Sequence, residues 1–322
     1  MTIVHTPVLP EELIRFLATE RMLSAVGEYM IDCTLGEGGH SAVFLSRFPN
    51  LRITGIDADK EIIKAARERL KEFGGRIEFY RGWAQDFLSC IGAGEAPSVC
   101  ETLTGNELPG IILLDLGVSL YHYQKGDRGF SFRVTETLDM RIDTERGQSA
   151  AEILASYSES ALADMFFFNA EERYSRRIAR AIAEARRVRA VADSSTLERL
   201  VWDAVPAACR HRRLHPATKV FQALRVEVNG ELKKLPGLLD AAFSALRPGG
   251  RLGVITFNSL EDRIVKNFFR VKSLGGGFHG SSKTPIVKEA LLLTAKPVTP
   301  SREELVSNPP SRSAKLRALE KL

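Results

Sequence analysis

The stretch YMIDCTLGEGGHSAVFLSRF, residues 29–48, decides the fold class because it joins two different patterns through a glycine-rich turn. Its apolar start reads as a buried strand, and its end has apolar side chains at helical spacing. Between them lie Gly36, Gly38 and Gly39, at the place where a doubly wound α/β fold binds a nucleotide-like ligand. The stretch therefore predicts a strand, a ligand-binding turn and a helix.

Strand-like and helix-like segments alternate on both sides of this stretch. Strands are expected from LRITGID, RIEFY, GIILLDL, RLGVITF and ALLLTAK, and helices from KEIIKAARERLKEF, VFQALRVEVNGELKKL, LPGLLDAAFSALR and SLEDRIVKNFFR. Such alternation is typical of a parallel sheet with helices on both faces. The predicted fold class is α/β, with a doubly wound, Rossmann-like core.

Strand patterns disappear between residues 139 and 213, where four helix-length segments follow one another. These segments are AAEILASYS, SALADMFFF, ERYSRRIARAIAEARR and STLERLVWDAV. In the last of them Ser195 is expected to cap the helix, because Glu198 follows three residues later. The sequence therefore predicts a discontinuous α/β core, residues 1–138 and 214–322, and an inserted helical domain for substrate recognition, residues 139–213.

The composition is that of a globular protein. The 322 residues are 44% hydrophobic and 26% charged, and no apolar run approaches the ~20 residues that cross a membrane. Residues 1–10 lack a charged start followed by an apolar signal core, so a cytoplasmic protein without a membrane partner is expected. Cys33, Cys90, Cys100 and Cys209 are scattered without metal-ligand spacing, and neither a metal site nor a disulfide framework is expected.

Basic residues gather in two places, although the net charge is only +5. Seven arginines lie between residues 173 and 189, and RHRRLHPATK, residues 210–219, is a second cluster. Arg176 and Arg180 share one side of a predicted helix, and Arg212 belongs to the second cluster. Such residues either form a solvated surface or contact phosphates.

Two acidic residues near the glycines indicate which cofactor the turn binds. Asp57 comes 21 residues after Gly36, at the end of the next predicted strand, where an acid can hydrogen-bond ribose hydroxyls. The dinucleotide fingerprint needs Gly or Ala where this chain has Ser41. Asp32, just before the turn, would repel a pyrophosphate but suits the cationic amino-acid end of S-adenosylmethionine. The pattern favours S-adenosylmethionine over NAD, unless Asp32 only caps the turn.

Several longer motifs occur along the chain in one order. They are HTPVL, DCTLGEGGHS, DLGVS, DRGFSF, LDMRID, RGQSAAEIL, HPATKVFQALRVEVNGEL, SLEDRIVKNFF and RSAKLRALEK. Together they make the chain resemble the bacterial methyltransferases that modify N4 of a cytosine in 16S ribosomal RNA. The resemblance extends from His5 to Lys321 and implies a class I methyltransferase core with an inserted helical domain. It also implies S-adenosylmethionine as the methyl donor and 16S rRNA in the small ribosomal subunit as the substrate. The oligomeric state is left open, with a homodimer as one candidate.

The resemblance also implies roles for single residues. The family's cofactor contacts fall on Gly38, Gly39, His40, Asp57 and Asp115 of this sequence.

Three further positions depart from the family pattern. His122 stands where a cofactor-binding glutamine is common, and Ala84 follows Trp83 where the family has an aromatic contact after the third strand. Asn258 replaces a histidine before SLEDR.

Asp115 ends the apolar run GIILLDL and is the leading candidate for catalysis. Cytosine N4 is a poor nucleophile, because its lone pair is delocalised into the ring. An acceptor for an N4 hydrogen would ease its attack on a methyl group held in line. Asp115 could serve as this acceptor or hold the cofactor amine, with Ser119 as a second polar contact. The alternative is that Asp115 only caps the following loop.

A target base would have to leave its stack and lie against aromatic or polar side chains. Candidates are Arg128, Phe130 and Phe132 after the DLGVS motif, together with His215 and Asn258. For the aromatic residues and His215 the alternative, which the pattern favours, is packing inside the protein.

Two other functions fit the same fold. A small-molecule methyltransferase would turn over a free metabolite and would show no salt-sensitive RNA binding. A non-catalytic RNA-binding factor in ribosome assembly would keep the fold without methyl transfer.

Overall fold

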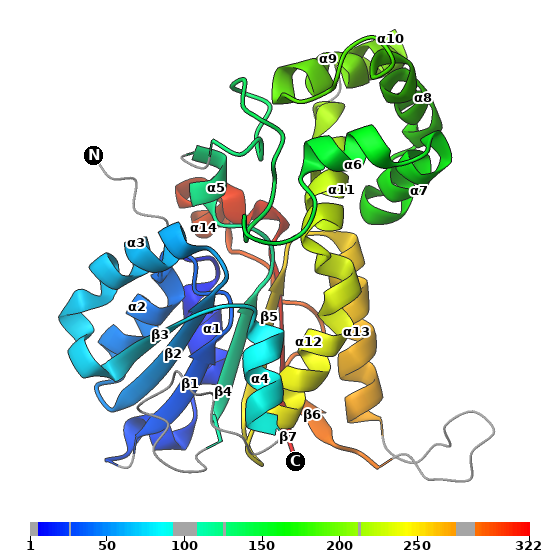
Figure 1. The fold of residues 1–322 in the computed structure, drawn as a ribbon. Coiled ribbons are helices and arrows are strands. Elements are labelled where there is room, and N and C mark those ends of the chain that lie inside the picture. The colour runs from blue at the N-terminus through cyan, green and yellow to red at the C-terminus, as the bar shows by residue number, and fades with distance from the viewer. Residues whose placement is uncertain (1–5, 26, 93–107, 125–126, 212–213, 275–286) are drawn as a thin grey trace. The chain divides into compact units, whose positions relative to one another are not determined.

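The computed structural model describes residues 6–25, 27–92, 108–124, 127–211, 214–274 and 287–322. The chain forms two compact units (Figure 1). Unit 1 comprises residues 1–118 and 234–322, and unit 2 comprises residues 119–233.

A seven-stranded sheet forms the centre of unit 1, in the order β3-β2-β1-β4-β5-β7-β6. The strands are β1 (Glu28–Asp32), β2 (Leu51–Asp57), β3 (Ile77–Arg81), β4 (Ile111–Asp115), β5 (Arg251–Thr256), β6 (Ala290–Leu292) and β7 (Lys315–Lys321). Strands β1 to β5 pair in parallel, whereas β7 is antiparallel to both β5 and β6. The predicted α/β fold class is confirmed.

Helices cover both faces of this sheet (Figure 1). They are α1 (Pro10–Leu17), α2 (Gly39–Arg47), α3 (Lys60–Leu70), α4 (Ala84–Gly92), α12 (Glu231–Ala245) and α13 (Ser259–Ser273). Unit 1 also contains α14 (Arg302–Ser307) and short 3-10 turns η1 (Glu20–Leu23), η2 (Lys71–Arg76) and η3 (Pro309–Ser313). Side chains of β4 alternate between two apolar cores, as strand geometry requires. Ile111 and Leu113 join the core under α1, α2 and α3. Ile112 and Leu114 join the core under α4, α12 and α13. Burial on both faces explains why these strands are continuously apolar.

Strand β7 was not expected from the sequence. It lies between β5 and β6 and pairs with β5 along its length, from Arg251 opposite Glu320 to Thr256 opposite Lys315. Its side chains Leu316, Ala318 and Leu319 are fully buried. The pattern KLRALEK does not alternate regularly, and the strand therefore gives no clear period-2 signal.

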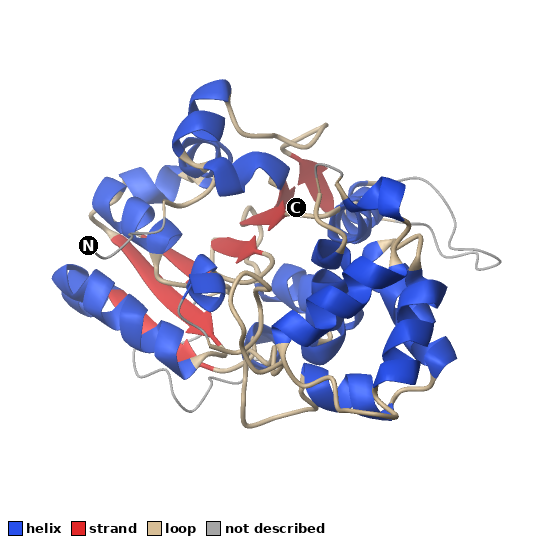
Figure 2. Ribbon diagram, turned by 90° about the horizontal axis from the view of Figure 1, so that it is seen from above, coloured by secondary structure: helices blue, strands red, loops and turns tan. Residues whose placement is uncertain are grey.

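Unit 2 is built from helices (Figure 2). They are α5 (Leu120–Gln124), α6 (Ala150–Ser156), α7 (Glu159–Ala170), α8 (Ser175–Ala185), α9 (Ser194–Ala204), α10 (Ala207–Arg210) and α11 (Ala217–Asn229). Among its described residues, the only β-type pairing is an isolated bridge between Thr137 and Asp193. Helix α11 packs against α6, α7 and α9.

The compact unit is wider than the predicted insertion, residues 139–213. It extends to residues 119 and 233, because α11 packs on the inserted helices and Thr137 pairs with Asp193.

Two local predictions were wrong. One helix was expected over residues 220–235, but α11 ends before Gly230, whose φ of 63° is left-handed and closes the helix. Helix α12 then runs through Pro236. The N-cap of α9 is Asp193, and not Ser195 as expected. The Asp193 side chain accepts a hydrogen bond from Thr196 N.

No helix in the described part of the chain is long and apolar enough to span a membrane.

Candidate functional site

The glycine turn links the end of β1 to the start of α2 in unit 1. Gly36 and Gly38 have φ values of 53° and 78°, which glycine adopts without strain. A Cβ atom on Gly38 would also lie 2.6 Å from Leu70 Cδ1 of α3. The turn therefore requires glycine at position 38 for both its backbone conformation and its packing.

Asp32 is buried at the last position of β1. Its Oδ2 accepts a hydrogen bond from Ser41 Oγ at 2.7 Å, and its Oδ1 accepts one from Thr34 N at 3.4 Å. Burial raises the pKa of Asp32, while the nearby His40 and these hydrogen bonds oppose the rise. Asp32 thus ties the turn to α2, and a carboxylate that accepts two hydrogen bonds can accept more.

Asp57 lies at the last position of β2, beside the glycine turn. Its Oδ2 accepts from Gly36 N at 3.1 Å, and its Oδ1 accepts from Asp59 N at 2.9 Å. The predicted proximity of this acid to the turn is therefore present in the structure.

Asp115 ends β4, the neighbour of β1 in the sheet. Its backbone N donates to Thr34 Oγ1 at 2.6 Å. Its Oδ2 lies 3.5 Å from His40 Nδ1, and its Oδ1 is buried with no hydrogen-bond partner among the described residues. Burial raises the pKa of Asp115 to about 6; the charge of His40 opposes this rise and that of Asp32 adds to it.

His40 belongs to the first turn of α2 and is buried. Its Nε2 lies 2.8 Å from the carbonyl oxygen of Val8, in the segment before α1. Its other ring nitrogen faces Asp115.

The carboxyl ends of three parallel strands bring together Asp32, Asp57 and Asp115, with His40 beside them. Such a group can hold a ligand that carries a cation and hydroxyl groups. No set of three His, Cys, Asp or Glu residues in the described part of the chain is arranged to hold a metal ion.

Ala84 and Asn258 also lie in unit 1. Ala84 begins α4 and is buried in the core, so its side chain offers only apolar contact. Asn258 caps α13, because its Oδ1 accepts from Leu260 N and Glu261 N at 3.0 Å each.

Ser119, His122, Arg128 and Phe130 lie at the start of unit 2. Ser119 Oγ accepts from Tyr121 N at the beginning of α5. The His122 and Phe130 rings are buried, with centroids 4.9 Å apart. Arg128 donates to the carbonyl oxygens of Arg141 and Ile142. In this structure His122 and Phe130 contribute to packing and do not form an exposed platform.

His215 lies between two aromatic rings of unit 2. Its centroid is 4.8 Å from that of Phe132 and 5.3 Å from that of Trp202, and both pairs are stacked. Its Nδ1 accepts from Ala217 N, and its Nε2 lies 3.2 Å from Glu198 Oε1. Each ring nitrogen of His215 therefore has a partner, which favours a packing role.

The two arginines singled out on α8 are exposed. Arg180 Nε lies 3.6 Å from Glu159 Oε1, and both side chains remain largely in solvent. Ile178 and Ile182, on the opposite stripe of α8, are fully buried. Arg212 lies outside the described residues.

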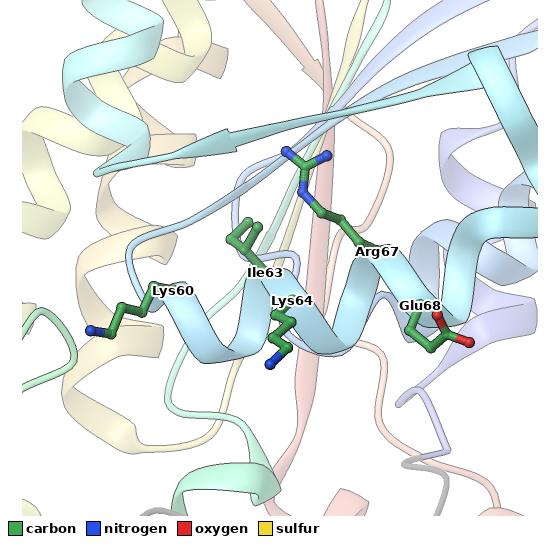
Figure 3. Close-up of a pocket in the computed structure, with 5 residues that line it drawn as sticks. All are labelled: Lys60, Ile63, Lys64, Arg67 and Glu68. Atoms are coloured by element: carbon green, nitrogen blue, oxygen red, sulfur yellow. The ribbon is translucent and has the colours of Figure 1, made fainter.

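A hollow runs along α3 (Figure 3). It is lined by Lys60, Ile63, Lys64, Arg67 and Glu68. The Arg67 guanidinium lies over the Phe79 ring of β3, 4.7 Å from its centroid. The hollow is formed by one helix face and contains none of the acidic residues described above.

The sequence as a whole decides which family this chain belongs to. Residues 2–322 match the MraW methylase family. This chain is a member of that family. It is 49% identical to "Ribosomal RNA small subunit methyltransferase H" of Treponema denticola, over 99% of this chain and 98% of the relative. Proteins of the same name from Treponema pallidum and Trichormus variabilis are 40% and 42% identical, over 98% and 99% of this chain and 92% of each relative.

Membership in the MraW methylase family confirms the predicted resemblance and identifies the chain as a methyltransferase. It also supports S-adenosylmethionine as the cofactor. Sequence reasoning missed three partners in the site: Thr34, Ser41 and the carbonyl of Val8. Val8 belongs to the HTPVL motif, but nothing in that motif indicates a role for a backbone carbonyl.

Proposed function

We propose that this chain transfers a methyl group from S-adenosylmethionine to N4 of a cytosine in 16S rRNA of the small ribosomal subunit. Its family and the names of its relatives support the general class of reaction. The observation that carries the choice of an exocyclic amine is Asp115. Its buried Oδ1 has no hydrogen-bond partner among the described residues, so it is available to accept a hydrogen from N4.

The residues around the glycine turn suit this cofactor. Asp32 and Asp115 would lie near its cationic amino-acid end, and Asp57 near its ribose hydroxyls. Gly36 and Gly38 hold the turn in a conformation that other residues rarely adopt, which would let the cofactor approach the backbone. When bound, the cofactor supplies an electrophilic methyl group.

The chain's own residues would then orient and deprotonate the amine. Asp115 Oδ1 would accept a hydrogen bond from N4 and so favour a pyramidal nitrogen with an available lone pair. The proton lost from N4 after alkylation would pass to Asp115 or to water. Because alkylated N4 is strongly acidic, positioning of the amine would contribute more than basicity.

The test of this proposal is nucleoside mass spectrometry of small-subunit rRNA from cells with and without the gene. We expect N4-methylcytidine to disappear on deletion, to return with the wild-type gene, and to stay absent when Asp115→Asn is expressed instead. An unchanged amount of N4-methylcytidine after deletion would rule the proposed reaction out.

The exposed arginines of α8 are proposed to contact RNA phosphates. We expect the double replacement of Arg176 and Arg180 by Ala to reduce the slope of the logarithm of the RNA-binding constant against the logarithm of the salt concentration by about 1.4. Each phosphate contact to single-stranded RNA contributes about 0.7 to this slope. The measurement is a binding titration of rRNA fragments at several salt concentrations. The matched control replaces Lys60 and Lys64 of α3, which removes the same charge from unit 1. Equal slopes for the two double variants would assign the α8 arginines to ordinary surface.

A further inference from the structure

The hydrogen bonds of His40 decide which of its ring nitrogens carries a hydrogen and therefore what faces Asp115. His40 Nε2 lies 2.8 Å from the carbonyl oxygen of Val8. A carbonyl oxygen can only accept a hydrogen bond. Nε2 must therefore carry a hydrogen, and this fixes the tautomer of the neutral ring.

The fixed tautomer determines what faces Asp115. In a neutral His40, Nδ1 would present a lone pair to Asp115 Oδ2, 3.5 Å away. An ionised carboxylate facing that lone pair would be repelled in this buried setting. The repulsion disappears if one proton is added to the pair, either on Nδ1 or on Oδ2. In both cases Oδ1 keeps its lone pairs.

Among the described residues, Asp32 is the other charged group that acts on Asp115. Asp32 faces it from β1, and its charge favours the protonated form of Asp115. Thr34 contributes a hydroxyl that is occupied by the backbone of Asp115, and Val8, among the described residues before α1, contributes its carbonyl oxygen.

We infer that His40 is a positioning residue for Asp115: held through Nε2 by the carbonyl of Val8, it shares one proton through Nδ1 with Asp115 Oδ2 and leaves Oδ1 as the acceptor for the substrate amine. The inference rests on the proposed function for the identity of that amine. It also gives the HTPVL motif a role, which is to fix the orientation and tautomer of a histidine from α2.

The first test is NMR spectroscopy of the full-length protein labelled with 15N-histidine, without RNA or cofactor. Correlations between ring nitrogens and carbon-bound hydrogens identify the tautomer, and His40→Asn assigns the signal. We expect the hydrogen on Nε2 wherever His40 is neutral. A neutral ring with its hydrogen on Nδ1 would overturn the inference, and this measurement needs only the wild-type fold.

The second test follows the 13Cγ signal of Asp115 through a pH titration. His40 lowers the pKa of Asp115 from the value that burial alone would give. In His40→Asn, the midpoint is therefore expected to move above that of the wild-type protein. His211→Asn, which replaces an exposed histidine of unit 2, should leave it unchanged. An unchanged midpoint in His40→Asn would mean that no proton is shared.

Both readouts are made without substrate. A negative NMR result with normal N4-methylcytidine in cells would reject only the role of His40. A positive NMR result without N4-methylcytidine would reject only the proposed reaction.

Discussion

Asp115→Asn is expected to lower the rate of methyl transfer at least ~100-fold, the usual contribution of a positioned acid or base. The amide keeps the size of the side chain and one acceptor oxygen, but it cannot share a proton with His40, so that oxygen is no longer held toward N4. It also cannot take up the N4 proton. The measurement is single-turnover transfer to small-subunit RNA under saturating cofactor, with RNA affinity measured in parallel. Weaker RNA binding combined with a normal transfer rate would show that Asp115 serves binding and not chemistry.

The same substitution is expected to stabilise the protein at pH 8. The pKa of Asp115 is raised to about 6 by burial, so folding favours the protonated carboxyl. The stabilisation is complete below the unfolded pKa of about 3.9 and is lost as the pH rises through about 6. At pH 8 the proton shared with His40 has been lost and the wild-type protein must bury an ionised carboxylate, so Asp115→Asn relieves this cost. We expect a gain of about 1 to 3 kcal/mol in the free energy of unfolding, since one pKa unit corresponds to about 1.4 kcal/mol.

Denaturant unfolding at pH 8 and pH 4 would measure this effect. The gain should largely vanish at pH 4, where the wild-type carboxyl is neutral as well. A variant that is less stable than wild type at pH 8 would mean that the ionised Asp115 is well compensated in the fold.

Asp262→Asn is expected to have the largest destabilising effect, about 3 kcal/mol, as is usual when one partner of a buried ion pair is removed. Asp262 of α13 accepts from Arg317 of β7 through both oxygens, at 2.8 and 3.2 Å. Arg317 is 8% exposed, so the substitution would leave a buried guanidinium without its carboxylate. Lys315 lies on the same carboxylate.

The pH dependence of this loss runs opposite to that of Asp115. Burial alone would raise the pKa of Asp262, but the hydrogen bond and charge of Arg317, together with Lys315, lower it overall. Its stabilising effect is therefore present above pH ~4 and lost as the pH falls through the lowered pKa. Unfolding free energies measured from pH 7 downwards should show a difference from wild type that shrinks as the carboxyl of Asp262 becomes protonated.

The control is Glu68→Gln, which removes one partner of the exposed Lys71–Glu68 pair of unit 1. Exposed pairs contribute little, so its unfolding free energy should match that of wild type. Equal unfolding free energies for Asp262→Asn and Glu68→Gln would contradict a structural role for Asp262.

Features encoded by neighbouring residues could be predicted from the sequence. The alternating strands and helices of unit 1 follow from local periodicity, and the proximity of Asp57 to Gly36 follows from the parallel order of β1 and β2. Strand β7 could not be predicted in the same way. Its burial depends on β5, which is far away in sequence, and its own pattern has no regular period.

The site shows the same division. Asp32, Asp57 and Asp115 could be placed because each of them lies at or near the carboxyl end of a predicted strand. The partners of these residues could not be placed, because a backbone carbonyl such as that of Val8 has no sequence signature. His215 and Phe130 were ambiguous for another reason: an aromatic residue in a loop packs inside a protein as readily as it stacks on a base.

The strand order has a consequence for how the chain folds. Strands β4 and β5 are direct neighbours in the sheet, yet all of unit 2 lies between them in sequence. The pairing at the centre of unit 1 must therefore wait until a very long segment has been synthesised, and contacts of this kind slow folding. If unit 2 folds first, the effective loop is shorter, although each halving lowers the closure cost by only about 0.6 kcal/mol. Until then the edge of β4 that later pairs with β5 presents unpaired backbone N–H and C=O groups on the nascent chain.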